Sequence, residues 1–307
     1  MTTHVLVHGN CHDGYGARYA YDLAVRDGRA EKAKHRSVAY GTPLKPEEFE
    51  PEDHVYILDF SYDRATLDAL AARVAHLEVV DHHASAEREL AGAPYALFDM
   101  NESGATLTWK RFFHNEPVPF LLRYIRARDL WRFDDMPDTE AVVSWIRSHR
   151  LTMEEWDVMA GLLETETGRA AAVTAGSSVL EADRLKVDKM SRHHGWASVG
   201  GVLVPCANAT ILYSDVGQRL CGVHPEAPFS AYYGVRSDGK WQWGLRGRGR
   251  VDLSVLAKTL GGGGHPDAAG FVEPAADALA RLAYPTKEQL KELGCGGPCP
   301  KIMEVLA

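Results

Sequence analysis

Three short apolar runs in the first third of the chain each end at a polar residue. They are residues 4–8, 55–59 and 77–81, and they end at His8, Asp59 and Asp81. Helix-like segments separate them. Near-continuous apolar strands that alternate with helices are typical of a parallel sheet covered on both faces. We therefore predict an α/β fold whose first domain holds a doubly wound, mainly parallel sheet.

The second half of the chain has a different composition. Residues 165–190 are rich in alanine with interspersed charged residues, and they predict a long helix. Beyond them, two strand-like runs flank Ser237-Asp238-Gly239, which is typical of a hairpin turn. We predict a sheet domain at residues 1–160, a linker helix at 161–190, a smaller α/β domain at 191–283 and a tail at 284–307.

Charge and cysteine content argue against several classes of protein. The 307 residues include 34 basic and 42 acidic ones, a formal net charge of −8, whereas proteins that bind long nucleic acid usually carry a basic footprint. No apolar run approaches the roughly 20 residues of a membrane span, so we expect no membrane partner. Five cysteines spread over the chain do not predict a disulfide framework. Without a secretory signal pattern, these features predict a cytoplasmic location.

Carboxylates and imidazoles gather at or just after the predicted strand ends. The set is His8, Asp13, Asp59, Asp81, His82, His83 and Asp129. Ligands bind at the carboxyl ends of strands in open parallel sheets, and carboxylates that crowd together repel one another unless cations neutralise them. Oxygen and imidazole ligands together suit Mn²⁺, with Fe²⁺, Co²⁺ or Zn²⁺ as alternatives. One or two such ions can hold a phosphoryl group and activate a water.

Two motifs together resemble the DHH phosphoesterase superfamily. Asp81-His82-His83 follows an apolar strand, and His8, Asp13 and Asp59 precede it in the family's order. Residues 261–265, four glycines and a histidine, are followed by Ala268-Ala269-Gly270, which is similar to the signature of the DHH-associated substrate domain. The resemblance covers about residues 4–275 and points to nanoRNase-like or oligoribonuclease-like members. It implies that residues 1–160 form a metal-binding catalytic domain and residues 191–283 a substrate-binding domain.

The resemblance implies ligands for two metal ions. His8 would bind the first ion, and Asp59 would bridge the two. The implied ligands of the second ion are Asp13, His82 and Asp129. The chain departs from the family pattern at Cys11, which stands where an aspartate is usual. A thiolate is a softer ligand that must lose a proton to bind, so the first site is weaker, uses Cys11 with a softer metal, or uses water instead.

The resemblance also implies catalytic and substrate-binding roles. Asp81 would orient His82, and His83 would act on the substrate phosphate as an acid or hydrogen-bond donor. Backbone N–H groups of the glycine run, with His265, would hold the far end of the substrate. The glycines concerned are Gly262, Gly263 and Gly264. Arg246 matches a substrate-binding arginine of the family. Ser103 is a candidate substrate contact, although its position at a predicted helix start also suits a cap.

Taken together, these features predict a manganese-dependent phosphoesterase that degrades short oligonucleotides to mononucleotides. Three alternatives stay open: a cyclic mono- or dinucleotide phosphodiesterase, a 3′-phosphoadenosine phosphatase, and a catalytically impaired nucleotide sensor. The acidic charge argues against long DNA as a partner, and a homodimer stays open. Cys295 and Cys299 lack a second pair of ligands, so no zinc site is predicted there.

Overall fold

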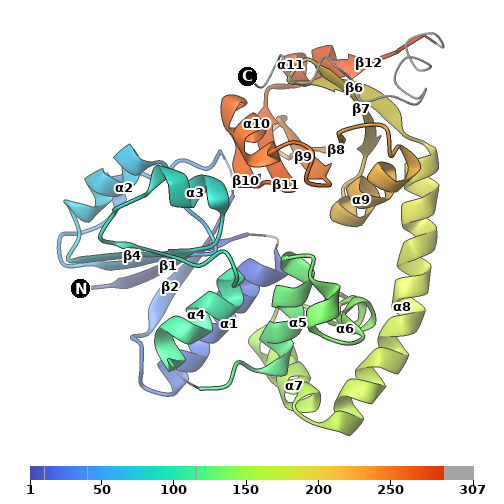
Figure 1. The fold of residues 1–307 in the computed structure, drawn as a ribbon. Helices are drawn as coiled ribbons and strands as arrows, with labels where there is room; N and C mark the ends of the chain where they lie inside the picture. The colour runs from blue at the N-terminus through green and yellow to red at the C-terminus, as the bar shows by residue number, and fades with distance from the viewer. Residues whose placement is uncertain (10, 40, 115, 287–307) are drawn as a thin grey trace. The chain divides into compact units, whose positions relative to one another are not determined.

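The computed structural model divides into two compact units, shown in Figure 1. It describes residues 1–286 except residues 10, 40 and 115. The units are Met1–Ala182 and Asp183–Ala307, so their boundary falls within the long helix α8 (Glu166–Arg192). Most of the predicted tail, including Cys295 and Cys299, lies outside the described residues. The predicted domain limits stay a prediction.

The first unit contains a five-stranded, fully parallel sheet, as predicted. Its strand order is β2-β1-β3-β4-β5. The strands are β1 (Thr3–His8), β2 (Ala33–Val38), β3 (His54–Leu58), β4 (His76–Asp81) and β5 (Ala96–Phe98). The chain leaves β1 toward β2 on one side and returns to β3 on the other. The carboxyl ends of β1 and β3 therefore lie at the switch point where such sheets bind ligands.

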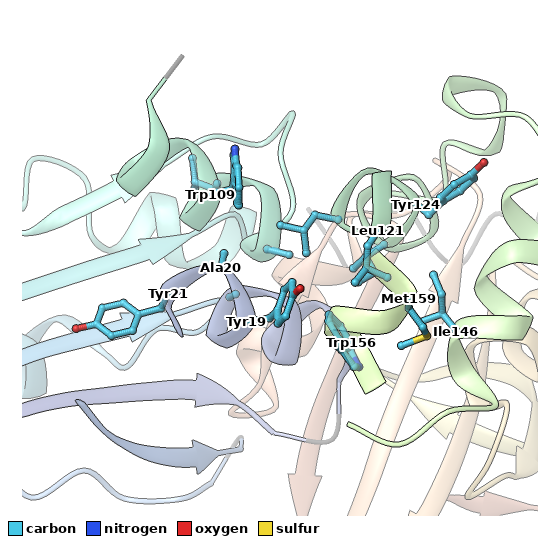
Figure 2. Close-up of a cluster of buried hydrophobic side chains, with 14 of the residues drawn as sticks. Tyr19, Ala20, Tyr21, Trp109, Leu121, Tyr124, Ile146, Trp156 and Met159 are labelled. Carbon is cyan, nitrogen blue, oxygen red and sulfur yellow. The ribbon is translucent and has the colours of Figure 1, made fainter. Parts of the chain in front are cut away.

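Alternating side chains of this sheet enter two separate cores. Val5 and Val7 of β1 pack with one set of helices, and Leu6 points to the opposite face with Leu67 of α2. Figure 2 shows the first core, in which Trp156 is fully buried near Tyr19. The α-helices of this unit are α1 (His12–Arg26), α2 (Arg64–Ala71), α3 (Ala84–Glu89), α4 (Gly104–Phe113), α5 (Phe120–Asp129), α6 (Thr139–Arg147) and α7 (Met153–Leu163). Burial on both faces explains why the strands read as continuous apolar runs.

The second unit contains a seven-stranded sheet in the order β10-β11-β9-β8-β7-β6-β12. Of its neighbouring strands, β7 and β8 pair in parallel, and the other pairs are antiparallel. The strands are β6 (Gly195–Val199), β7 (Val202–Asn208), β8 (Phe229–Val235), β9 (Trp241–Gly247), β10 (Gly263–His265), β11 (Ala268–Glu273) and β12 (Leu282–Ala283). The helices are α9 (Tyr213–Val223), α10 (Leu253–Thr259) and α11 (Ala275–Arg281). This second, mixed α/β part agrees with the predicted fold class.

Local contacts fix the ends of several elements. The Asp63 side chain accepts the Thr66 N–H at 2.9 Å and caps α2. The predicted hairpin is the antiparallel pair β8–β9. Trp243 lies in the core of the second unit. Among the described residues, no helix combines the length and apolar content needed to cross a bilayer.

Candidate metal centre

The ends of two neighbouring strands bring His8 and Asp59 together. Gly9 follows β1 and donates its N–H to the Val38 carbonyl at 2.7 Å, which turns the chain toward α1. A Cβ at Gly14 would lie 2.1 Å from the His8 carbonyl oxygen, so only glycine lets the first turn of α1 lie against the end of β1. The His8 Nδ1 atom is then 3.6 Å from Asp59 Oδ2.

Asp59 is buried in an unusual backbone conformation. Its φ is 56°, in the left-handed region that few residues other than glycine, asparagine and aspartate adopt. Its N–H still donates to the Val80 carbonyl at 2.9 Å, and this contact holds it beside β4. A Cβ at Gly104 would lie 2.3 Å from the Asp59 Cβ, so the start of α4 packs directly against this carboxylate. Strain of this kind is commonly found at functional sites.

The two oxygens of Asp59 face two different groups of side chains. Oδ2 faces His8, and the ligand atoms of His8, Cys11 and Asp59 lie within 4.8 Å of one another. Oδ1 lies 3.1 Å from His82 Nε2. His82 also belongs to a second group, whose ligand atoms lie within the same distance of one another. The members of that group are Asp13, His82 and Asp129.

The second group surrounds one ring nitrogen of His82. Asp13 Oδ2 and Asp129 Oδ2 each lie 3.5 Å from His82 Nε2. Asp13 is buried, and its carboxylate also accepts the N–H groups of Gly104 at 2.6 Å and Ala105 at 3.0 Å. These contacts place it at the N-terminus of α4, where backbone N–H groups and the helix dipole favour negative charge.

Asp129, which joins Asp13 and His82 in the second group, is the last residue of α5. Trp131 has a φ of 56°, and Arg132 donates its N–H to the Ala127 carbonyl at 2.7 Å, which is the geometry of a Schellman stop. The guanidinium of Arg128 lies 4.1 Å from the centre of the Trp131 ring. The Asp129 side chain is 28% exposed, whereas those of Asp13 and Asp59 are buried.

The structure corrects the predicted role of Asp81. Its Oδ1 accepts a hydrogen bond from the ring Nδ1 of His83 at 2.6 Å, and from His82 it accepts the backbone N–H at 2.7 Å. Asp81 therefore orients the ring of His83, because His83 begins α3 and turns its ring back toward the strand end. Ser61 donates to the other oxygen of Asp81 at 2.6 Å.

Proton affinities in the cluster follow from this crowding. Burial would lower the pKa of His8 and of His82, but the neighbouring Asp59 carboxylate outweighs it and raises both well above the usual value. Burial would raise the pKa of Asp59, but the same two histidines hold it well below its usual range. Burial raises the pKa of Asp13, and Asp59 and Asp129 raise it further. Burial also raises the pKa of the Cys11 thiol. Protons thus supply the positive charge that the carboxylates require.

The donor set suits divalent metal ions. Three carboxylates, two imidazoles and one thiol converge, and such oxygen, nitrogen and sulfur donors are the ligands of manganese, iron, cobalt and zinc. Asp59 Oδ2 is buried and accepts no hydrogen bond from the described residues, so a lone pair faces His8 and Cys11. The residues present therefore fit a metal centre.

The structure places Ser103 at the start of α4, where the sequence also suits a cap. It is buried at the N-cap of α4, and its N–H donates to Thr106 Oγ1 at 3.1 Å. Its role as a substrate contact stays a prediction. Its position next to Gly104 helps to fix the turn against which Asp13 and Asp59 pack.

In the second unit, the glycine run forms a tight hairpin instead of an open loop. Gly262 donates its N–H to the Ala257 carbonyl at 2.8 Å, and a Cβ there would lie 2.0 Å from the Gly270 carbonyl oxygen. The prediction that this N–H holds a phosphate is therefore wrong. Gly263, Gly264 and His265 form β10, which pairs with β11. The Arg246 guanidinium donates to Ser214 Oγ at 2.5 Å and lies 5.5 Å from the centre of the Tyr232 ring.

Three residues that shape the centre carry no sequence signal of their own. Ser61 holds Asp81, and Gly14 and Gly104 make room for His8 and Asp59. An Asp-Gly pair at a helix start and a Ser-Gly pair before another helix are common in proteins without metal sites. Only their packing in three dimensions gives them a role in this centre.

Comparison with known proteins finds one family match in the second unit. Residues 224–292 match the family model described as the DHHA1 domain. This match agrees with the resemblance to the DHH superfamily that the sequence motifs indicate. It is also 30% identical over 285 residues to uncharacterized protein R106 of Acanthamoeba polyphaga mimivirus. That alignment covers 87% of this chain and 66% of the viral protein.

Solved structures show more distant likeness. RecJ from Thermus thermophilus, in complex with Mn²⁺, is 16% identical with a TM-score of 0.44, over 91% of this chain and 50% of that one. The pGpG-specific phosphodiesterase PggH from Vibrio cholerae is 13% identical with a TM-score of 0.41, over 91% of this chain and 96% of that one.

Proposed function

We propose that this chain is a metal-dependent phosphoesterase that hydrolyses phosphodiester bonds. The observation that carries the proposal is the orientation of Asp59, whose two oxygens face His8 and His82 separately. A carboxylate in this position can bridge two divalent ions, and two-ion sites are typical of phosphoryl-transfer enzymes. We propose one or two Mn²⁺ ions, with Fe²⁺, Co²⁺ and Zn²⁺ as alternatives.

We propose the following roles for residues of the first unit. The ligands would be His8, Cys11, Asp13, Asp59, His82 and Asp129. Divalent ions held there would neutralise the phosphate charge and supply an activated water. Asp81 keeps a proton on Nδ1 of His83, so Nε2 is the ring nitrogen that can exchange a proton with a substrate oxygen. Burial would raise the pKa of Asp81, but His83 lowers it to about 2, so this carboxylate stays charged as the anchor.

We further propose that the substrate is a short oligonucleotide, from dinucleotide to pentanucleotide length, cleaved to mononucleotides in the cytoplasm. The net charge of −8 disfavours long, continuous contacts with phosphate backbones. Arg246 offers one guanidinium for a phosphate contact, and that group lies 5.5 Å from the centre of the Tyr232 ring. His265 remains a proposed substrate contact. Cyclic nucleotides and 3′-phosphoadenosine phosphate are the alternative substrates.

The test is a substrate panel assayed with Mn²⁺ on wild type and Asp59→Asn. The panel contains dinucleotides, longer single strands, cyclic dinucleotides and phosphoadenosine phosphate. Asparagine also tolerates the left-handed conformation of residue 59, so the variant keeps the backbone. We expect a loss of about a thousandfold or more in kcat/KM, because the bridging charge is gone. The control is Asp68→Asn, which alters a carboxylate that is 52% exposed on α2.

Unchanged hydrolysis by Asp59→Asn would show that the centre is assigned to the wrong residues. Faster cleavage of longer single strands than of dinucleotides would contradict the proposed substrate while leaving the phosphoesterase proposal intact. Faster cleavage of cyclic dinucleotides or phosphoadenosine phosphate would select one of the alternatives.

A further inference from the structure

We infer that the His8–Cys11–Asp59 group selects a thiophilic divalent ion such as Zn²⁺, whereas the Asp13–His82–Asp129 group selects a hard ion such as Mn²⁺. The inference rests on the proposed metal centre and is independent of the proposed substrate. It assigns two different ions to two halves of one centre that share the Asp59 carboxylate.

The position of Cys11 supports a ligand role. Cys11 is the N-cap of α1, with extended φ and ψ of −127° and 138°, and its side chain makes no capping hydrogen bond. Helix caps favour Ser, Thr, Asp or Asn, whose oxygens bond the first N–H groups of the helix. Its sulfur instead lies within 4.8 Å of the ligand atoms of His8 and Asp59. The structural demands of the helix therefore do not account for a cysteine here.

The two groups differ in the ions that their donors prefer. Thiolate with imidazole is a donor pair that favours Zn²⁺ or Fe²⁺ over Mn²⁺, whereas carboxylates favour Mn²⁺. The second group contains two carboxylates and one imidazole and holds no sulfur. Because Asp59 presents one oxygen to each group, it can serve a soft and a hard ion at once.

The other described cysteines have structural surroundings. Cys206 lies in the core of the second unit, where burial raises its pKa to about 12. Cys221 donates its S–H to the Arg246 carbonyl at 3.1 Å. Among the described cysteines, only Cys11 belongs to a group of three metal-type ligands. This makes Cys221→Ser a matched control, because serine preserves the donor at that position.

The experiment is a Co²⁺ titration of the metal-stripped full chain, followed by absorption spectroscopy. Co²⁺ is a spectroscopic substitute for Zn²⁺, and thiolate ligation produces a sulfur-to-cobalt charge-transfer band in the near ultraviolet. We expect this band in wild type, Cys221→Ser and Asp129→Asn, and we expect none in Cys11→Ser or Cys11→Asp. Zn²⁺ should abolish the band by displacement, whereas Mn²⁺ at equal concentration should not.

Cys11→Asp provides the second readout. Aspartate is a good helix N-cap, so this variant is expected to fold even if Cys11→Ser does not. Competition titrations with elemental analysis should show that its preference for Zn²⁺ over Mn²⁺ at the first group falls by about tenfold or more, a change of the size seen when the surroundings of a metal ligand are altered. An unchanged preference would overturn the inference.

The outcomes separate this inference from the proposed function. Bound Co²⁺ without the band in wild type, or a band that persists in Cys11→Ser, would overturn the inference alone if the panel still shows Mn²⁺-dependent hydrolysis. A band without hydrolysis of any panel substrate would overturn the proposed function alone. A chain that binds no Co²⁺ at all would overturn both the inference and the metal centre.

Discussion

Histidines of the two units have opposite surroundings. In the first unit, three carboxylates lie within 3.1 to 3.5 Å of His82 Nε2. In the second unit, His194 Nε2 lies 2.8 Å from Nε2 of another histidine, His224. Burial lowers the pKa of His194 and the charge of His224 lowers it further, whereas the carboxylates raise the pKa of His82 above its usual value.

The difference shows what makes a cluster of polar residues attract a cation. The negative neighbours of His82 favour its positively charged form, and a divalent ion can take over that charge. His194 donates from Nδ1 to the Ser191 carbonyl at 2.8 Å, so in its neutral form it accepts at Nε2 from His224. His224 in turn contacts Glu226 through Nδ1 at 2.9 Å. The His194–His224 pair therefore belongs to a hydrogen-bond chain whose members satisfy one another, unlike the carboxylate cluster around His82.

The largest effect is expected from Gly104→Ala. The new Cβ would lie 2.3 Å from Cβ of Asp59, so either α4 or the Asp59 carboxylate must move. A displacement of about 1 Å at a reacting centre typically costs about a hundredfold in rate, and we expect at least that loss in kcat. Phosphoesterase assays with Mn²⁺ measure it.

Gly161→Ala is the matched control for this substitution. No atom lies within 4 Å of a Cβ at Gly161, which is in the helix α7. Alanine there should keep the rate and raise stability by about 0.5 to 1 kcal/mol. If both glycine variants keep wild-type activity, the close packing of α4 on Asp59 does not position the centre.

A smaller effect, on stability, is expected from Asp13→Ala compared with Asp129→Ala. Each substitution removes one carboxylate from the Asp13–His82–Asp129 group, so both should relieve a similar amount of repulsion between carboxylates. Only Asp13 also accepts two N–H groups of α4, and its loss leaves both buried without that acceptor. We expect Asp13→Ala to be less stable than Asp129→Ala by about 2 kcal/mol. Denaturant unfolding of the metal-free chain measures the difference, and equal stabilities would refute the capping role of Asp13.

The smallest effect concerns the pH dependence of stability in the second unit. The folded pKa of His194 is lowered, so its contribution to stability is present above the ordinary histidine pKa of about 6.5 and is lost as the pH falls below it. We expect acidification to lower the Tm of wild type more than that of His194→Gln, which cannot take up a proton there. His193→Gln, altering the exposed neighbour, should behave like wild type. Parallel Tm curves for wild type and His194→Gln would contradict this interpretation.

Much of the fold was accessible from local patterns. The apolar runs predicted a parallel sheet because both of its faces are buried. The long helix was predicted from composition at residues 165–190 and spans Glu166–Arg192. The pattern did not predict α6 and α7, whose side chains pack mainly against residues distant in sequence, such as Trp156 with Tyr15 and Tyr19.

The amino-acid sequence by itself determined which polar residues stand at the ends of parallel strands, because strand length and period are local properties. Only the tertiary structure decided which atoms meet. Asp13 caps a helix that begins 91 positions later, Asp81 holds the ring of His83 rather than the ring of His82, and the glycine run closes into a hairpin. Contacts of this kind depend on how separate elements pack and on which rotamer each side chain then adopts, and neither is encoded in the spacing of residues along the chain.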